Sequence, residues 1–107
     1  MFKFLKSLLG GPDENELIAA IEKGALLVDV RSEKEFAQGS VKGAVNIPLQ
    51  KISADSARLK GSESIIVFCQ SGARSSMALK VLKKQGFQNV LNGGSWQNVL
   101  NLASRSH

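Results

Sequence analysis

Residues 64–75 read Ser-Ile-Ile-Val-Phe-Cys-Gln-Ser-Gly-Ala-Arg-Ser. The apolar run at 65–68 is short and continuous, which is typical of a strand buried on both faces of a parallel sheet. Residues 75–85 carry apolar side chains at helical spacing and end before a glycine, which predicts a helix there. A buried strand, a tight loop and a helix therefore follow one another along the chain, and this order decides the fold.

Cys69 is the only cysteine, and it lies where the strand ends and the loop begins. Backbone N–H groups of a tight loop and the positive end of the following helix stabilise a thiolate and bind an anion beside it. Arg74 adds a permanent positive charge. The alternative is a structural cysteine that packs as a small hydrophobic residue. The sequence Gly72-Ala73-Arg74, which begins three positions after Cys69, favours the reactive thiolate.

Strands and helices alternate on both sides of this stretch. We expect further strands at 25–30, 44–48 and 90–91, and helices at 12–24, 32–39, 49–59 and 95–103. This alternation predicts an α/β fold, a small parallel β-sheet flanked by helices on both faces. Ligands bind at the carboxyl ends of the strands in such sheets, and both Asp29 and Cys69 fall at a strand end.

The chain has 107 residues, enough for one domain with one modest core. We expect an N-terminal extension at 1–11 and the domain at 12–104. Residues 1–9 are apolar with two lysines, which fits an end that frays or packs as a short helix better than an interfacial anchor. No signal peptide is recognised and no run has the length of a membrane span, so a cytoplasmic location is expected.

The counts of reactive residues limit the chemistry. One cysteine excludes an internal disulfide and a resolving partner, while the one histidine, His107, lies at the chain end, which argues against a Cys–His pair or a zinc site. The net charge is +5, but the lysines are scattered without interleaved aromatics, so no nucleic-acid partner is expected. A mild positive field attracts small anions. We expect neither a metal nor an organic cofactor.

Several motifs, in this order and spacing, resemble the rhodanese family. They are Val28-Asp29-Val30-Arg31, Glu35-Phe36, Gly39, Gly43-Ala44-Val45-Asn46-Ile47-Pro48-Leu49, the loop from Cys69 to Ser75, Gly86-Phe87 and Gly93-Gly94-Ser95-Trp96. The resemblance covers roughly residues 12–100 and is to a single-domain member. It implies a sulfurtransferase, in which the loop cysteine takes a sulfane sulfur from a small anionic donor such as thiosulfate and becomes a persulfide. The sulfur then passes to a thiol, to cyanide or to a protein acceptor.

The resemblance also implies roles for the loop residues. Cys69 and Arg74 match the catalytic positions, and the expected substrate-binding residues are Gln70, Ser71, Gly72, Ala73 and Ser75. Four residues separate the cysteine from the arginine, whereas cysteine phosphatases use five to fit a tetrahedral phosphate. A phosphatase or arsenate reductase is therefore disfavoured. A non-catalytic persulfide carrier or protein-interaction module of the same fold stays open.

Two positions depart from the family pattern. Gln70 stands where an arginine or lysine often follows the cysteine, which removes one cation beside an anionic donor. Ser40 stands where a histidine often follows the glycine, a position expected to serve packing or hydrogen bonding.

The remaining polar and glycine residues have structural interpretations. Asp29 and Arg31 are expected to form a structural ion pair, and Ser75 to cap the helix or donate to the thiolate. Gly72 is expected to supply a conformation or a close approach that a Cβ would block. Gly93-Gly94 is expected either to line the pocket mouth or to make a turn. Trp96 is expected to pack in the core.

Overall fold

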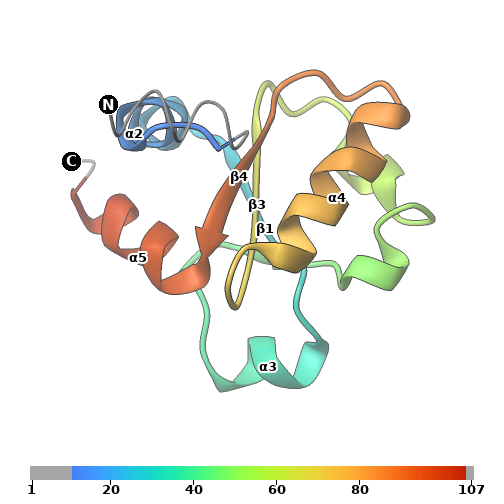
Figure 1. Cartoon of the computed structure of the whole chain (residues 1–107), viewed down its shortest axis with the longest axis horizontal. Helices are drawn as coiled ribbons and strands as arrows, with labels where there is room; N and C mark the ends of the chain where they lie inside the picture. The colour runs from blue at the N-terminus through green and yellow to red at the C-terminus, as the bar shows by residue number, and fades with distance from the viewer. Residues whose placement is uncertain (1–10, 106–107) are drawn as a thin grey trace.

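The computed structural model describes residues 11–105. Four parallel strands form one sheet in the order β2-β1-β3-β4, as Figure 1 shows. The strands are β1 (Leu26–Asp29), β2 (Val45–Asn46), β3 (Ile65–Cys69) and β4 (Val90–Ser95). The predicted α/β fold class is therefore confirmed.

Helices cover both faces of the sheet. Helices α2 (Glu14–Glu22) and α5 (Trp96–Arg105) pack on one face, and α4 (Ala73–Lys84) packs on the other with the 3-10 turns η1 (Leu49–Lys51) and η2 (Ser56–Leu59). The short helix α3 (Glu33–Gln38) lies beyond the carboxyl ends of the strands (Figure 1).

Strand β3 is buried along its whole length and divides its side chains between two core clusters. Ile65, Val67 and Cys69 face the cluster that contains α4, while Ile66 and Phe68 face the cluster that contains α2 and α5. This alternation follows from the two-residue period of a strand. It sets the Cys69 side chain on the face where α4 begins.

Local signals placed two of the helix starts. Ser32 and Glu35 form the predicted capping box of α3, in which the Ser32 Oγ accepts from the Glu35 N–H and a Glu35 carboxylate oxygen accepts from the Ser32 N–H. Helix α2 begins after Asp13, whose carboxylate accepts from the Glu16 N–H. The sequence suggested Pro12 as the first helical residue. In the structure Pro12 instead precedes the N-cap.

The predicted helix at 49–59 is wrong. Residues 49–51 and 56–59 form two separate 3-10 turns, between which Ser56 Oγ donates to the Ser53 carbonyl. Serine and aspartate side chains compete with helical backbone hydrogen bonds, which explains the break in this segment. Ile52 and Leu59 are nevertheless buried and anchor it to the core.

Strand β4 is longer than the two residues predicted, because its Asn-Gly-Gly segment continues the pairing with β3. The register shifts there: Asn92 lies opposite Val67, whereas Gly94 lies opposite Phe68. The extra residue is Gly93, where an added Cβ would lie 2.5 Å from Val99 Cγ2. Such contacts are sterically forbidden, so the bulge depends on glycine.

The expected extension at 1–11 falls almost entirely outside the described residues, as does His107. The division of the chain at residue 12 stays a prediction. No helix in the described part of the chain is long and apolar enough to cross a membrane.

Candidate active site

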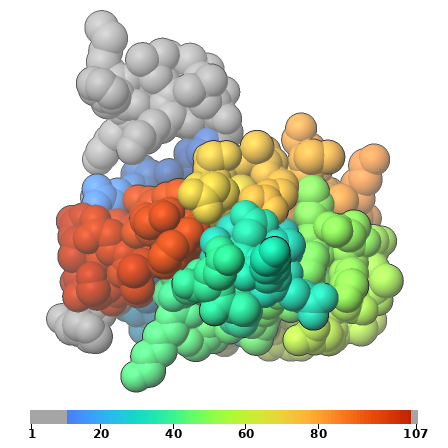
Figure 2. All heavy atoms as spheres, turned by 90° about the horizontal axis from the view of Figure 1, so that it is seen from below, coloured from blue at the N-terminus to red at the C-terminus, as the bar shows by residue number. Residues whose placement is uncertain are grey.

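The carboxyl edge of the sheet carries the loop between β3 and α4. Figure 2 views the molecule from this edge, and the segment around residue 70 lies there beside the segment at 30–40. Both Asp29 at the end of β1 and Cys69 at the end of β3 lie at this edge, as the parallel topology predicted.

The Cys69 sulfur is surrounded by hydrogen-bond donors from the loop. The Gly72 N–H lies 3.0 Å from Sγ, the Ser75 N–H 3.4 Å and the Ser75 hydroxyl oxygen 3.5 Å. Cys69 is 1% exposed. The positive end of a helix and a curled loop therefore meet at one sulfur, an arrangement that stabilises negative charge.

Gly72 is the N-cap of α4 and has a left-handed backbone, with φ of +101°. An added Cβ would lie 3.4 Å from the Cα of Gly94. The left-handed conformation, one of the two reasons that the sequence suggested for Gly72, is confirmed. The other is not, because a Cβ at 3.4 Å would make an ordinary van der Waals contact and would not be blocked. Because Gly72 turns the chain so sharply, α4 begins at Ala73, two residues earlier than predicted.

The Cys69 thiol is more acidic than an ordinary cysteine. Burial of the sulfur raises the pKa of the thiol. Hydrogen bonds from the Ser75 hydroxyl and N–H, and from the N–H groups of Ser71 and Gly72, lower that pKa by more, so the pKa lies below its usual value. Arg74 is not among the largest causes of this shift, so hydrogen bonds dominate over the arginine charge.

Arg74 is held by Glu35 of α3. The guanidinium makes two parallel hydrogen bonds to the carboxylate, with Nη1–Oε1 at 2.7 Å and Nη2–Oε2 at 3.0 Å. The hydrogen bond to Glu35 raises the pKa of Arg74, and the negative charge of Cys69 contributes less to this rise. Arg74 lies at the loop as expected from the sequence, but no local sequence signal pointed to its carboxylate partner, 39 positions away.

Asp29 and Arg31 form a buried ion pair, with Arg31 Nη2 at 2.8 Å from Asp29 Oδ2. The structural interpretation fits the surroundings of the pair: Arg31 donates to the Gly39 carbonyl, and Ser40 Oγ lies 2.6 Å from Asp29 Oδ2. The guanidinium also lies over the Trp96 ring, 5.1 Å from its centroid. Ser40 thus has the local hydrogen-bonding role expected of its position.

Asn92 of β4 is a site residue that sequence reasoning missed. Its Oδ1 lies 2.7 Å from Ser75 Oγ, and its Nδ2 lies 3.3 Å from the Gly72 carbonyl oxygen. Ser75 is the third residue of α4 and not its cap, so of its two expected roles only the contact with the sulfur agrees with its position. The available signal was a polar residue directly after the strand expected at 90–91 and directly before Gly93-Gly94.

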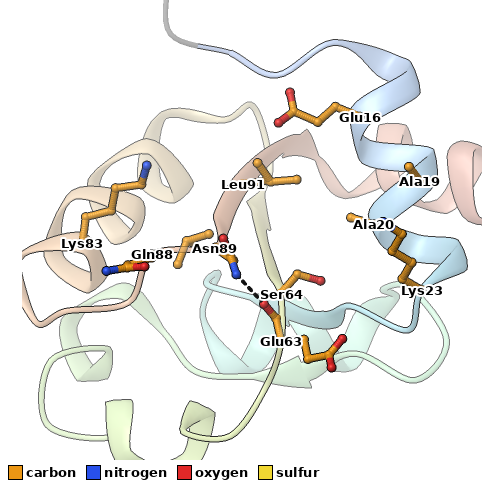
Figure 3. Close-up of a pocket in the computed structure, with 11 residues that line it drawn as sticks. Glu16, Ala19, Ala20, Lys23, Glu63, Ser64, Lys83, Gln88, Asn89 and Leu91 are labelled. Carbon is orange, nitrogen blue, oxygen red and sulfur yellow. Dashed lines mark hydrogen bonds between the residues drawn. The ribbon is translucent and has the colours of Figure 1, made fainter.

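Hollows in the surface do not coincide with the sulfur. A cavity of about 420 Å³ beside the loop is lined in part by Ser71, Gly72 and Gly94. A larger one of about 690 Å³ lies at the opposite, amino-terminal edge of the sheet (Figure 3). Its lining mixes acidic and basic side chains, including Glu16 and Lys83, and no buried side-chain polar atom among the described residues lacks a partner. The geometry at Cys69, and not cavity size, is therefore what makes this loop the candidate site.

No group of three or more histidine, cysteine, aspartate or glutamate side chains in residues 11–105 could hold a metal ion.

The fold and the loop define an α/β domain that presents one acidic cysteine at the carboxyl edge of a parallel sheet. The family model of the rhodanese-like domain matches residues 13–100. The chain belongs to the rhodanese-like domain family.

Curated relatives support this membership. A protein of Allochromatium vinosum named sulfurtransferase is 37% identical over 67 residues, which cover 63% of this chain and 63% of that protein. The thiosulfate sulfurtransferase PspE of Escherichia coli is 30% identical over 74 residues, covering 67% of this chain and 71% of PspE. The chain spans only 36% to 63% of the first curated relatives that it matches.

Solved structures resemble this one over most of the chain. The human single-domain sulfurtransferase TSTD1 has a TM-score of 0.65 and 28% identity, covering 81% of this chain and 91% of that one. A rhodanese from E. coli solved with anions has a TM-score of 0.66 and 28% identity, covering 70% of this chain and 91% of that one. One of the curated relatives, a protein of Bacillus subtilis, is named provisionally as a sulfur carrier.

The Ser75 hydroxyl is expected to lower the pKa of Cys69. Ser75→Ala removes one donor to the thiolate, so the pKa of Cys69 rises toward its ordinary value. The rate of alkylation against pH measures this pKa. Ser76→Ala is the matched control, because Ser76 follows directly in α4 and has no hydrogen bond to the sulfur among the contacts described. Equal midpoints in both variants would contradict the role of Ser75.

The pair of Glu35 with Arg74 predicts a pH dependence of stability. The hydrogen bond from Arg74, followed by the one from the Ser32 N–H, lowers the pKa of Glu35 from 4.5 to about 2. Because the pKa of Glu35 is lower in the folded protein, its ionised form stabilises the fold fully above about pH 4.5. This stabilisation is lost as the pH falls toward 2. Glu35→Gln therefore destabilises at neutral pH, and the loss shrinks in acid.

Urea unfolding of the wild type and Glu35→Gln at neutral and acidic pH measures this difference. Glu33→Gln is the control, because Glu33 is highly exposed and its contact with Lys51 is 3.6 Å long. A free-energy difference for Glu35→Gln that stays constant between neutral pH and about pH 3 would contradict the assignment.

Proposed function

We propose that this chain is a rhodanese-type sulfurtransferase in which Cys69 carries the sulfur as a persulfide. The supporting observation is the set of donors around Sγ, with the Gly72 N–H at 3.0 Å and the Ser75 N–H at 3.4 Å. These donors favour the thiolate that attacks the donor and the anionic sulfur that is then carried.

The proposed reaction is a double displacement. The Cys69 thiolate attacks the outer sulfur of thiosulfate, a new S–S bond forms, and the bond to the inner sulfur breaks as sulfite leaves with the electron pair. An acceptor thiolate or cyanide then attacks the outer sulfur of the persulfide. This second step breaks the S–S bond and returns Cys69 as a thiolate, so no external oxidant or reductant is required.

The loop residues have distinct roles in this proposal. The backbone N–H groups of Gln70, Ser71, Gly72 and Ala73 surround the transferred sulfur, and the Ser75 hydroxyl adds one donor. Arg74 completes the positive environment, but its guanidinium is already paired with Glu35. Arg74 therefore acts mainly by fixing the start of α4 against α3.

A short loop supports sulfur transfer over phosphate chemistry. Four residues lie between Cys69 and Arg74, and the donors converge on the sulfur itself. Arg74 points its two-pronged guanidinium at Glu35, whereas a phosphatase would need that fork for phosphate oxygens. We propose a cytoplasmic location as well, since a single reactive thiol without a disulfide partner suits a reducing compartment.

A persulfide carrier is the second candidate, because one relative is named provisionally as a sulfur carrier. Both functions need the same persulfide at Cys69. They differ in turnover: an enzyme releases many equivalents of sulfur to a small acceptor, whereas a carrier releases one equivalent to a partner protein.

Intact mass spectrometry tests the proposal directly. Incubation with thiosulfate or a persulfide donor should add the mass of one sulfur atom, and cyanide or a thiol should remove it. Cys69→Ser should show no addition while unfolding at the same urea concentration, because the change is nearly isosteric. Multiple turnovers support the enzyme, and a single stoichiometric release supports the carrier. A mass that never changes with any sulfane donor would refute both.

Gln70 predicts a weak response to anionic donors. The side chain is exposed beside the loop and carries no charge, while both nearby arginines are paired with carboxylates. Gln70→Arg adds a cation at a partly screened site, so kcat/KM for thiosulfate should rise roughly two- to tenfold, mainly through KM. The gain should shrink at high salt and be small for a neutral persulfide donor.

Gln88→Arg is the matched control for this variant. It makes the same change of charge on an exposed glutamine that lines the hollow at the opposite edge of the sheet (Figure 3). It should leave thiosulfate kinetics unchanged. If Gln70→Arg and Gln88→Arg behave alike at low salt, the side chain at position 70 does not face the donor.

A further inference from the structure

The Ser75 hydroxyl has more acceptors than it has protons. Its oxygen lies 2.7 Å from Asn92 Oδ1, 3.1 Å from the Gly72 carbonyl oxygen and 3.5 Å from Cys69 Sγ. A serine hydroxyl donates one proton at a time. The distances therefore favour Asn92 as the acceptor while Cys69 is an uncharged thiol, which can itself donate its S–H to Ser75 Oγ.

The amide orientation of Asn92 is fixed by its backbone neighbours. The Gly94 N–H donates to Oδ1 at 2.9 Å, and Nδ2 donates to the Gly72 carbonyl at 3.3 Å. A flipped amide would place its NH₂ group against the Gly94 N–H, where no acceptor would remain. The register shift that places Gly94 beside the loop thus also directs Oδ1 toward Ser75.

Ionisation of Cys69 changes where the Ser75 proton goes. When the thiol proton leaves to solvent water, Sγ becomes a charged acceptor, and the hydroxyl turns from Asn92 toward the sulfur because charge-assisted hydrogen bonds are the stronger ones. The Ser75–Asn92 hydrogen bond is then present with the thiol and absent with the thiolate. An interaction made in only one protonation state shifts the balance toward that state.

We propose that Asn92 is a positioning residue that competes with Cys69 for the Ser75 hydroxyl proton, and so balances Cys69 as nucleophile against Cys69 as leaving group. The role of this balance in sulfur transfer rests on the proposed function. The Cys69 thiolate attacks the donor in the first step and leaves from the persulfide in the second. A more basic thiolate attacks faster and leaves more slowly.

Removal of the amide should therefore have opposite effects on the two half-reactions. Asn92→Leu removes the nearest acceptor while nearly keeping the side-chain volume, so the Ser75 hydroxyl has only the Gly72 carbonyl and Cys69 left as acceptors and turns more readily to the thiolate. The midpoint of alkylation against pH should fall by about half to one unit, the equivalent of one neutral hydrogen bond. Above the midpoint, loading from thiosulfate should slow about two- to threefold and release to cyanide should quicken by a similar factor.

The charged groups around Cys69 stay in place in this variant. They are Arg74 of α4 with its partner Glu35 of α3, and the pair of Asp29 and Arg31 at the end of β1. The hydrogen bonds of the Asn92 side chain are to Ser75, Gly72 and Gly94, none of which is charged. A change in the midpoint can therefore be assigned to the hydrogen bonds at the loop.

A double-mutant cycle with Ser75 is the decisive test. Asn92→Leu should lower the midpoint in the wild-type background and leave it unchanged in the Ser75→Ala background, because Asn92 acts through the hydroxyl. Asn92→Ala removes the same acceptor and should shift the midpoint in the same direction, so the test does not depend on how well leucine is accommodated. Asn98→Leu is the control, since Asn98 donates to the Gly93 carbonyl nearby without contacting Ser75, and it should leave the midpoint unchanged.

A raised or unchanged midpoint in both Asn92 variants would overturn the proposal, as would an equal fall in the Ser75→Ala background. The alkylation midpoint needs no sulfur donor, so the cycle stands even if the wild type transfers no sulfur. Absence of sulfur transfer would refute the proposed function alone. An alkylation midpoint that the Asn92 substitutions leave unchanged, in a protein that does transfer sulfur, would refute this inference alone.

Discussion

The Gly72 N–H lies 3.0 Å from Cys69 Sγ, and this contact depends on a backbone that only glycine adopts readily, with φ of +101°. The turn lets α4 begin at once, so that the Ser75 N–H and hydroxyl also reach the sulfur. Gly94 of β4 lies close to the same turn, since an added Cβ at Gly72 would be 3.4 Å from the Gly94 Cα. The β-bulge in β4 places Gly94 there, so the surroundings of the Cys69 sulfur depend on the register of the sheet.

Paired charges surround this arrangement. Arg31 is bound to Asp29 in the interior, and Arg74 is bound to Glu35 at the rim. Because each guanidinium is matched by a carboxylate, the sulfur depends on local N–H and O–H donors more than on net positive charge. Such donors act at hydrogen-bond range and favour a single sulfur atom over a large, highly charged anion. Glu35 also belongs to the capping box of α3, so the same carboxylate joins the two helices nearest the loop.

Local sequence signals predicted much of the fold. The apolar run of β3, the capping box at Ser32 and the glycine before α4 each act within a few residues, and the structure contains all three. The segment at 49–59 was mispredicted, because its apolar residues anchor two 3-10 turns and not one helix. The contacts of Arg74 with Glu35 and of Ser75 with Asn92 span 39 and 17 positions. They follow from tertiary packing, which no local pattern encodes.

A crystal structure of the protein loaded with sulfane sulfur would show whether the loop between β3 and α4 holds a persulfide. We expect one additional sulfur bonded to Cys69 Sγ and lying within hydrogen-bond distance of the backbone N–H groups of residues 70–74. The turn at Gly72 should be unchanged. A loaded sulfur that points to bulk solvent, or a loop that must unfold its turn to admit the sulfur, would contradict the claim that this loop is built to hold a persulfide.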